Sequence, residues 1–322
     1  MSRAACRVIA VDVGGSNVRA ALFEGVERRG EVVVRPTPEG AGEVLDAICD
    51  AVRAVAILHG LKPGDVRAVG VGFPGVFDPV RGVSVQAGNL RGWRGGPVAG
   101  PLEARLGWPV AVDNDVRAGA YGELRAGAAT DVDDVVYVSI GTGVGGAVFV
   151  GGRPCLGSGF AAGELGHMVL DASAEGAACR CGQTGHVEAL LSGYAIEAAA
   201  QAVTGRRWSA SEALLAGREG APGLDGLYRS VVRYLALFLA TAAAALAPQR
   251  IVVGGGLGTH PAYPVEAACD ALQRLAPAWV ARDARVVRAR LGPWSGLTGA
   301  AVLALRRAGC EQHASSGMGG SM

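Results

Sequence analysis

The order of apolar and polar positions in the first third of the chain predicts a mixed sheet with helices packed on it. Three apolar runs follow one another at hairpin spacing with glycine-containing turns between them, as in consecutive antiparallel strands. In the next stretch, Val44, Ile48, Val52 and Val55 fall on one face of a helix. Two further apolar runs come later. The predicted strands are residues 7–13, 18–23, 31–34, 66–72 and 110–112, and the predicted helix is residues 40–61.

The same order of elements begins again after residue 113. Residues 161–185 lack sustained apolar periodicity and are predicted to form a loop, and residues 314–322 are predicted to be a disordered tail. Each half contains a strand hairpin with a glycine-rich turn. This predicts an internal structural repeat, with two phosphate-binding turns on either side of a cleft. The predicted helices are residues 115–127, 188–202, 209–215, 228–246 and 298–307, and the predicted strands are residues 134–140, 145–150 and 250–253.

Length and composition describe a globular protein with more than one domain. The chain has 322 residues, and at about 150 residues per domain this favours two domains. Half of the residues are apolar and 18% are charged, which excludes disorder for most of the chain. The formal net charge is +1, so no basic field is present to attract nucleic acid.

Targeting and cysteine signals predict a cytoplasmic protein. Residues 1–7 are too short, ahead of the first strand, for a secretory signal. The longest apolar stretch, residues 234–247, is predicted to be a buried helix because a membrane span needs about 20 residues. Of the seven cysteines, only Cys179 and Cys181 are close in sequence. We therefore expect a reducing compartment and a metal site rather than a disulfide framework.

Two glycine-rich turns are candidates for binding phosphate. Asp12 ends the first strand, and Gly14 to Asn17 follow it, with Ser16 and Asn17 as side-chain donors. Residues 139–146 form the second such turn. An ordinary tight hairpin is the alternative for each, and neither matches the Walker pattern. Two such turns together with the later glycines 254–256 favour a nucleotide site.

Asp115 is the candidate general base. It follows a predicted strand directly and opens a predicted helix, so capping the helix is the plain alternative. If Asp115 faces the cleft, its carboxylate is suited to accept a proton from a hydroxyl that attacks a phosphoryl group.

The segment around the paired cysteines has the spacing of a metal site. His167 lies twelve residues before Cys179, and His186 lies five residues after Cys181. These side chains offer four nitrogen or sulfur ligands in a glycine-rich loop, which is typical of structural zinc. Chance clustering is the alternative. Four protein ligands leave no position for water, so the zinc is expected to be structural rather than catalytic.

Taken in order, these motifs make the chain similar to the ROK family (repressor, open reading frame, kinase) of sugar kinases in the actin-like ATPase superfamily. The similarity covers residues 7–307. It implies an α/β fold, the two-lobed actin-like ATPase (ribonuclease H-like) fold with a central nucleotide and sugar cleft. The matching motifs are Asp12-x-Gly14-Gly15-Ser16, Gly72-Phe73-Pro74-Gly75, Asn89-Leu90 with Trp93, Asn114-Asp115, Gly141-Thr142-Gly143-x-Gly145-Gly146, Glu164-x-Gly166-His167, Cys179-x-Cys181-Gly182-x-x-Gly185-x-x-Glu188 and Gly254-Gly255-Gly256-Leu257.

The resemblance also implies the domain limits. Residues 1–113 and about 299–313 would form a small α/β domain. Residues 114–298 would form a large α/β domain that carries a zinc loop at 164–188. The protein is expected to be a cytoplasmic homodimer or homotetramer that acts on a small-molecule sugar and binds neither nucleic acid nor membrane.

The roles of individual residues are carried over from the family by position. Asp115 would be the base for the 6-hydroxyl of glucose, with ATP as donor, and Asp12 would position Mg²⁺. His167 would bind zinc through one ring nitrogen and face the sugar with the other. The implied sugar ligands are Asn89, Asn114, Asp115, Glu164, His167 and Glu188; the implied zinc ligands are His167, Cys179, Cys181 and His186; the implied nucleotide residues are Asp12, Gly14, Gly15, Ser16, Asn17, Gly141, Thr142, Gly143, Gly255, Gly256 and Leu257.

Differences from the family pattern leave several sugars as candidate substrates. The family usually has a third cysteine where this chain has His186, and Arg117 stands where many members have Asn. Glucose is the first choice, with kanosamine, glucosamine, N-acetylmannosamine or a C7-cyclitol as alternatives. A sugar-responsive regulator is less favoured because Asp12 leaves no room ahead of it for a helix-turn-helix. A nonenzymatic sugar-binding module would lack the base or the phosphate turns, and both are present.

Overall fold

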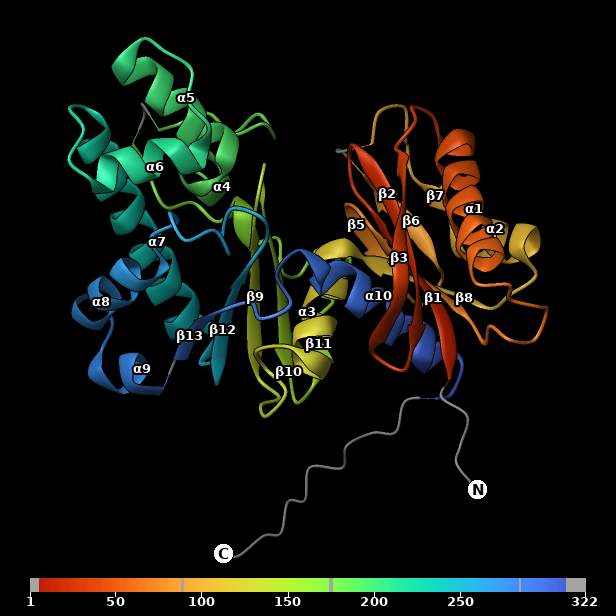
Figure 1. The fold of residues 1–322 in the computed structure, drawn as a ribbon. Coiled ribbons are helices and arrows are strands. Elements are labelled where there is room, and N and C mark those ends of the chain that lie inside the picture. Colours follow the sequence, from red (N-terminus) through yellow and green to blue (C-terminus); the bar gives the residue numbers. More distant parts are fainter. Residues whose placement is uncertain (1–5, 88–89, 174–175, 284, 311–322) are drawn as a thin grey trace, which may run out of the picture. The chain divides into compact units, whose positions relative to one another are not determined.

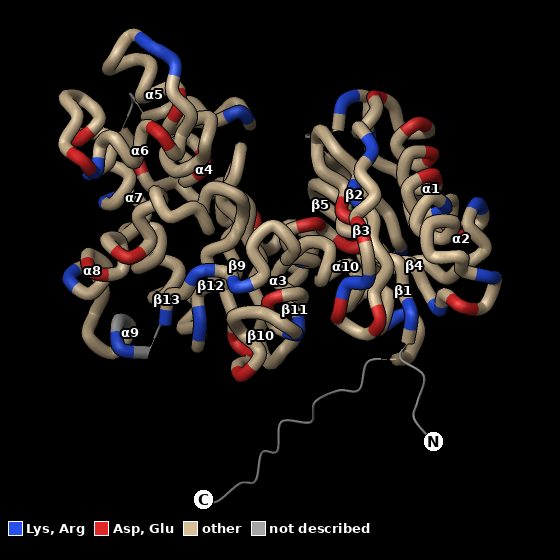
Figure 2. The backbone as a smooth tube through the Cα atoms, viewed as in Figure 1, with Lys and Arg blue, Asp and Glu red and all other residues tan. Residues whose placement is uncertain are grey.

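The computed structural model describes residues 6–87, 90–173, 176–283 and 285–310 of the chain, which fold into two compact units (Figure 1). The first unit comprises Met1–Asp115 and Ala300–Met322, and the second comprises Val116–Gly299. Acidic and basic residues are interspersed along the elements of both units (Figure 2), in keeping with the net charge of +1. The predicted tail at 314–322 lies outside the described residues.

A five-stranded mixed sheet forms the centre of the first unit, in the order β3-β2-β1-β4-β8. β1, β2 and β3 are joined as antiparallel hairpins, whereas β4 and β8 run parallel to β1. The predicted mixed sheet is thereby confirmed. The strands are β1 (Arg7–Val13), β2 (Asn17–Glu24), β3 (Glu27–Pro36), β4 (Val69–Phe73) and β8 (Val110–Asn114).

Helices cover both faces of this sheet. α1 (Ala41–Leu58) packs its apolar face on β1, β2 and β3, and its buried residues share one core with Val69 and Val71 of β4. Gly70 lies between these two valines and therefore faces the other way. On that side a Cβ at Gly70 would lie 1.8 Å from the carbonyl oxygen of Ala300, so only glycine allows α10 to approach this closely. The remaining elements of the unit are α2 (Ala99–Leu106), the part of α10 (Ser295–Arg307) from Ala300 on, and a small sheet of β5 (Val76–Asp78), β6 (Val83–Gln86) and β7 (Gly96–Pro97).

The second unit repeats the strand pairing of the first. Its sheet has the order β11-β10-β9-β12-β13, with two antiparallel pairs followed by two parallel pairs. The predicted internal structural repeat is therefore confirmed at the level of the sheets. The strands are β9 (Val135–Ile140), β10 (Val144–Val150), β11 (Arg153–Pro154), β12 (Arg250–Gly254) and β13 (Arg285–Arg288).

Most helices of the second unit pack on one face of its sheet and bury a large core there. The other face meets α3, where Gly119 lies against the Tyr137 ring and Tyr121 packs edge-on against Phe149. The helices are α3 (Asp115–Ala126), α4 (Val187–Leu191), α5 (Gly193–Thr204), α6 (Ala210–Arg218), α7 (Leu224–Leu246), α8 (Val265–Leu275) and α9 (Ala278–Asp283), with short 3₁₀ turns at Leu165–His167 and Gly292–Trp294.

The helix α7 is longer than its apolar stretch suggested. It begins at Leu224 and has 23 residues, so the expectation that it is too short to cross a membrane is wrong on length. Among the described residues it is the one helix long and apolar enough to do so. A core helix has the same composition, and α7 packs against α6 and α8 with Leu235, Phe238 and Leu239 fully buried.

Sequence periodicity missed several short elements and merged two helices. It did not identify α2, α8, α9, β13 or the small sheet, whose strands have only two to four residues. The helix predicted at 188–202 is interrupted at Ser192, whose hydroxyl accepts a hydrogen bond from the amide of Ala195 and caps α5. The predicted loop at 161–185 contains one 3₁₀ turn and no longer element among its described residues.

A disulfide joins the two ends of the first unit. Cys6 precedes β1 and Cys310 follows α10, and their Cα atoms are 6.4 Å apart. The expectation of no disulfide framework is therefore wrong for this pair. Their separation of 304 positions in the sequence hides the pairing, because only the folded unit brings the ends together.

Reduction of this disulfide should lower the free energy of unfolding by about 3–5 kcal/mol, because a cross-link across a long loop restricts the unfolded chain. Urea unfolding with and without reductant measures the difference. Cys6→Ser should match the reduced protein and no longer respond to reductant. Equal urea midpoints for the oxidised and reduced wild type would contradict this expectation.

Candidate active site and metal centre

The strand register of the first unit places its candidate site residues Asp12, Asn114 and Asp115 at one edge of the sheet. Asp12 in β1 lies opposite Gly72 in β4, and Gly72 lies opposite Asp113 in β8. These three strands are parallel, so Asn114 and Asp115 follow at the same carboxyl edge as Asp12. Such edges are where open α/β sheets bind their ligands.

Hydrogen bonds fix Asn114 and orient the neighbouring carboxylate. The buried Asn114 amide nitrogen Nδ2 donates to the carbonyl of Gly75 (2.8 Å) and to Oδ1 of Asp115 (3.0 Å). The backbone N–H of Asn114 donates to Asp113 (2.7 Å). Asp115 is half-buried at the first position of α3. Its carboxylate is therefore held in place and is still partly accessible.

The hairpin turn after Asp12 presents exposed backbone and side-chain donors. The amide of Gly14 donates to the carbonyl of Asn17 (2.9 Å), and residues 15–17 are exposed. Burial raises the pKa of Asp12, and the charge of Arg19, its cross-strand partner, lowers it in part. Because burial makes the charged form of the Asp12 carboxylate unfavourable, a cation beside it would stabilise that form.

The two glycine-rich turns of the second unit are bonded to each other. They follow the neighbouring parallel strands β9 and β12, in which Ser139 lies opposite Gly254. The Ile140 carbonyl accepts from the amides of Leu257 (3.0 Å) and Gly258 (2.9 Å). Gly255 has φ +81°, and a Cβ there would lie 2.4 Å from the Ile140 carbonyl oxygen. Only glycine fits this close approach.

Glu188 connects the metal loop to the first of these turns. Its Oε2 accepts from the Val144 amide (3.0 Å), and its Oε1 lies 3.8 Å from the Cys179 sulfur and 3.5 Å from the Tyr194 hydroxyl. A Cβ on Gly143 would lie 2.6 Å from Oε2, so a larger residue there would displace the Glu188 carboxylate. The family resemblance implied that Glu188 is a sugar ligand but gave no sign of this contact.

Tyr194, which the sequence did not single out, contacts the metal loop and Glu188. The Arg180 guanidinium lies 4.0 Å from its ring centroid, a cation–π contact that joins the metal loop to α5. Burial, with a smaller contribution from Glu188, raises the pKa of Tyr194 to about 12. Nothing in its local sequence distinguishes it from a core tyrosine.

The four predicted metal ligands come together in the structure. One ligand atom from each of His167, Cys179, Cys181 and His186 lies within 4.8 Å of all the others. The two Nδ1 atoms are 3.3 Å apart, the Cys181 sulfur is 3.3 Å from Nδ1 of His186, and the Cys179 sulfur is 3.9 Å from Nδ1 of His167. Tetrahedral zinc with bonds of about 2.0–2.3 Å places its ligand atoms about 3.3–3.8 Å apart. The donor set fits that ion, and the two separations of 3.3 Å match this range, whereas the Cys179 sulfur lies slightly farther out.

The remaining predicted sugar ligands are distributed as follows. Glu164 and His167 are both exposed, at the start and end of the 3₁₀ turn Leu165–His167. Since His167 presents Nδ1 to the cluster, its Nε2 is the nitrogen left to face a ligand. Asn89 lies outside the described residues.

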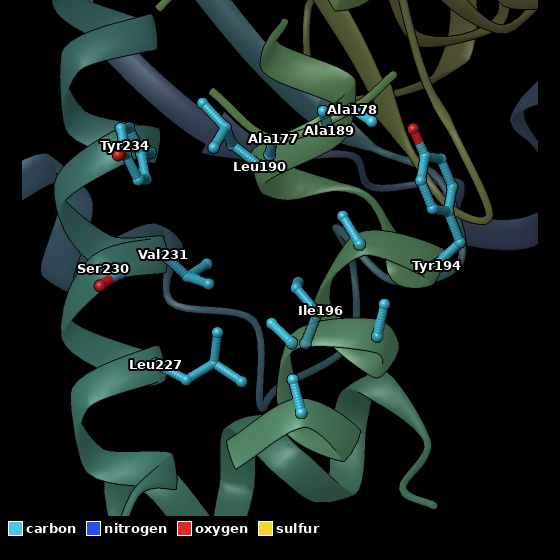
Figure 3. Close-up of a pocket in the computed structure, with 14 residues that line it drawn as sticks. Ala177, Ala178, Ala189, Leu190, Tyr194, Ile196, Leu227, Ser230, Val231 and Tyr234 are labelled. Atoms are coloured by element: carbon cyan, nitrogen blue, oxygen red, sulfur yellow. The ribbon is translucent and has the colours of Figure 1, made fainter. Parts of the chain in front are cut away.

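A cavity of about 510 Å³ lies beside this region, between α5 and α7 (Figure 3). Its wall is made of alanine and aliphatic side chains, with Tyr194, Ser230 and Tyr234 as the hydroxyl-bearing residues. Of the predicted sugar ligands that the structure describes, none lines it. Its apolar lining does not suit a polyhydroxylated substrate.

Comparison with known proteins identifies the family. The ROK family profile matches residues 8–307. The glucokinase of Streptomyces coelicolor is 30% identical, over 92% of this chain and 96% of its own length. An N-acetyl-D-glucosamine kinase of Salmonella paratyphi A is 31% identical, over 91% and 98%.

A solved structure extends this to the fold. The ROK family glucokinase from Streptomyces griseus, in complex with glucose and AMPPNP, is 31% identical, with a TM-score of 0.75 over 93% of this chain and 99% of that one. The expected two-lobed actin-like ATPase fold is thereby confirmed. The chain belongs to the ROK family.

Proposed function

We propose that this protein is an ATP-dependent sugar kinase that transfers the γ-phosphate of ATP to the 6-hydroxyl of glucose or a close analogue. The main support is the arrangement at the carboxyl edge of the first sheet. Asn114 orients the Asp115 carboxylate there, and Asp12 lies at the same edge. A base for a hydroxyl and a carboxylate for a cation are what phosphoryl transfer to an alcohol requires.

Asp115 acts as the general base. The sugar oxygen forms a bond to the γ-phosphorus, the bond from that phosphorus to the bridging oxygen of ADP breaks, and the hydroxyl proton passes to the Asp115 carboxylate. Asn114 donates to Oδ1 of Asp115 and so holds that carboxylate in position. Asp12 would hold Mg²⁺, which neutralises phosphate charge when bound.

Backbone groups bind the nucleotide. The turn Gly14, Gly15, Ser16 and Asn17 and the turn Gly141, Thr142 and Gly143 lie at the phosphates. The amides of Gly14 and Gly141 donate within their own turns, so the phosphate oxygens accept from the other donors of these residues. Gly255, Gly256 and Leu257 lie near the adenosine. The amides of Leu257 and Gly258 donate to the carbonyl of Ile140, directly before the turn at Gly141, which supports a common role of these two turns in binding the nucleotide.

The metal loop orders the sugar-binding side chains. His167, Cys179, Cys181 and His186 would hold zinc, and four protein ligands would leave no position for water, so the metal would have a structural role. Together with Asn89 and Asn114 of the first unit, Glu164, His167 and Glu188 bind the sugar hydroxyls. The Glu188 contacts to Cys179 and Val144 support a link between the metal loop and the turn at Gly143.

Glucose is the first choice of acceptor, and an amino sugar is the second. The Salmonella N-acetyl-D-glucosamine kinase is as similar to this chain as the Streptomyces glucokinase, which favours testing both classes. ADP release should be measured with glucose, glucosamine, kanosamine, N-acetylglucosamine, N-acetylmannosamine and a C7-cyclitol. We expect the highest kcat/KM for glucose. No sugar-dependent ADP release with any of them would overturn the proposal.

A further inference from the structure

One arginine forms hydrogen bonds along the loop that follows β12. This loop begins with the turn Gly255–Leu257, called the nucleotide turn below because of its proposed role. Arg288 is the last residue of β13 and lies opposite Val253. Its Nη1 donates to the carbonyls of Gly258 (2.7 Å) and His260 (3.1 Å), and its Nη2 donates to the carbonyl of Tyr263 (2.8 Å). Three carbonyls of one loop therefore converge on one side chain.

A carboxylate completes the set of partners around Arg288. Glu266, in the first turn of α8, accepts from Nε (2.8 Å) and Nη2 (2.6 Å). This pairing lowers the pKa of the Glu266 carboxyl. A guanidinium has five N–H donors, and the five contacts use all of them. Arg288 is therefore a scaffold for the loop and has no donor left for a ligand.

The nucleotide turn is fixed from its other side as well. The carbonyl of Ile140 accepts the amides of Leu257 and Gly258, and the Thr259 hydroxyl donates to the carbonyl of Gly255 (2.8 Å). Residues 255–259 are thus held between the end of β9 and Arg288. A shift of the loop would move this turn relative to the neighbouring turn at Gly141.

We infer that Arg288 is a positioning residue for the nucleotide, which acts by holding residues 258–263 so that Gly255–Leu257 meet the adenosine in a fixed place. This inference rests on the proposed nucleotide role of that turn. It assigns to Arg288 an effect on nucleotide affinity and none on the sugar or on proton transfer.

The test uses AMPPNP binding by calorimetry, together with the KM values for ATP and glucose. Arg288→Met should weaken AMPPNP binding and raise the KM for ATP by about tenfold, the scale of one charged hydrogen bond, while the KM for glucose stays within about twofold. Arg288→Lys should restore part of the loss, because an ammonium keeps the pair with Glu266 but cannot span three carbonyls.

Arg250 provides a matched control in the same unit. It also pairs with a carboxylate, Asp131 (Nη2 to Oδ2, 3.0 Å), and donates to a carbonyl, that of Ala128. It lies at the opposite end of β12 from the nucleotide turn. Arg250→Met should destabilise the unit without changing AMPPNP affinity.

Hydrogen exchange of a peptide covering residues 254–263 provides a readout that does not need activity. Arg288→Met should speed exchange there, and Arg250→Met should not. Wild-type AMPPNP affinity in Arg288→Met, or an equal loss in Arg250→Met, would overturn the inference. Failure of the wild type itself to bind AMPPNP would instead overturn the proposed nucleotide site, while the exchange rates would still test the role of Arg288 in the loop.

Discussion

Asp115→Asn is expected to lower kcat by about 10²- to 10⁴-fold, the usual scale for loss of a general base. An amide has nearly the same shape as the carboxylate and its oxygen can still accept from Nδ2 of Asn114, so the local structure should persist. The amide cannot take the proton of the attacking hydroxyl. Steady-state kinetics with saturating glucose and ATP measures the loss.

The KM for ATP and the thermal midpoint of Asp115→Asn serve as its controls. Both should stay near the wild-type values, because Asp115 has no assigned contact with the nucleotide and lies at the start of a helix that is otherwise unchanged. If kcat remains within about threefold of the wild type, a general-base role is excluded for this residue.

Loss of a metal ligand should affect metal content, sugar binding and stability together. The wild type should contain about one zinc per chain, and His186→Ala should contain less, because a structural site needs all four ligands. The KM for glucose should rise, since the loop carries Glu164, His167 and Glu188. The KM for ATP should rise to a smaller extent, because Glu188 also accepts from the amide of Val144. Elemental analysis and kinetics give these values.

His186→Cys and Cys155→Ala are the matched variants for this experiment. The first restores the thiolate that the family usually carries at this position and should keep both zinc and activity. The second removes a cysteine outside the cluster and should change neither. A wild type that is purified without metal and phosphorylates sugar at full rate would refute the structural role of the metal.

The sheet and the metal ligands could be predicted because their signals are local. The apolar runs of β1, β2 and β9 and the helical face of α1 lie within single segments of sequence. The metal ligands could be predicted from sequence spacing alone, and the structure places these four side chains together: His167, Cys179, Cys181 and His186. Short elements with mixed composition, such as β13, carry no comparable signal.

Contacts that depend on packing could not be predicted. The disulfide between Cys6 and Cys310 joins residues at the two ends of the chain. Arg288 is one of many arginines in the sequence, and only the folded loop shows that its donors converge on three carbonyls. The contact of Glu188 with the amide of Val144 likewise depends on how the metal loop folds back over β10.

The central claim is phosphoryl transfer from ATP to the 6-hydroxyl of a hexose, and identification of the product tests it most directly. Purified protein with ATP, Mg²⁺ and glucose should be followed by phosphorus NMR until the nucleotide is consumed. The account predicts equal amounts of ADP and glucose 6-phosphate, and no ADP when glucose is left out. Phosphate attached at another hydroxyl, or ATP consumption that is independent of every sugar tested, would contradict it.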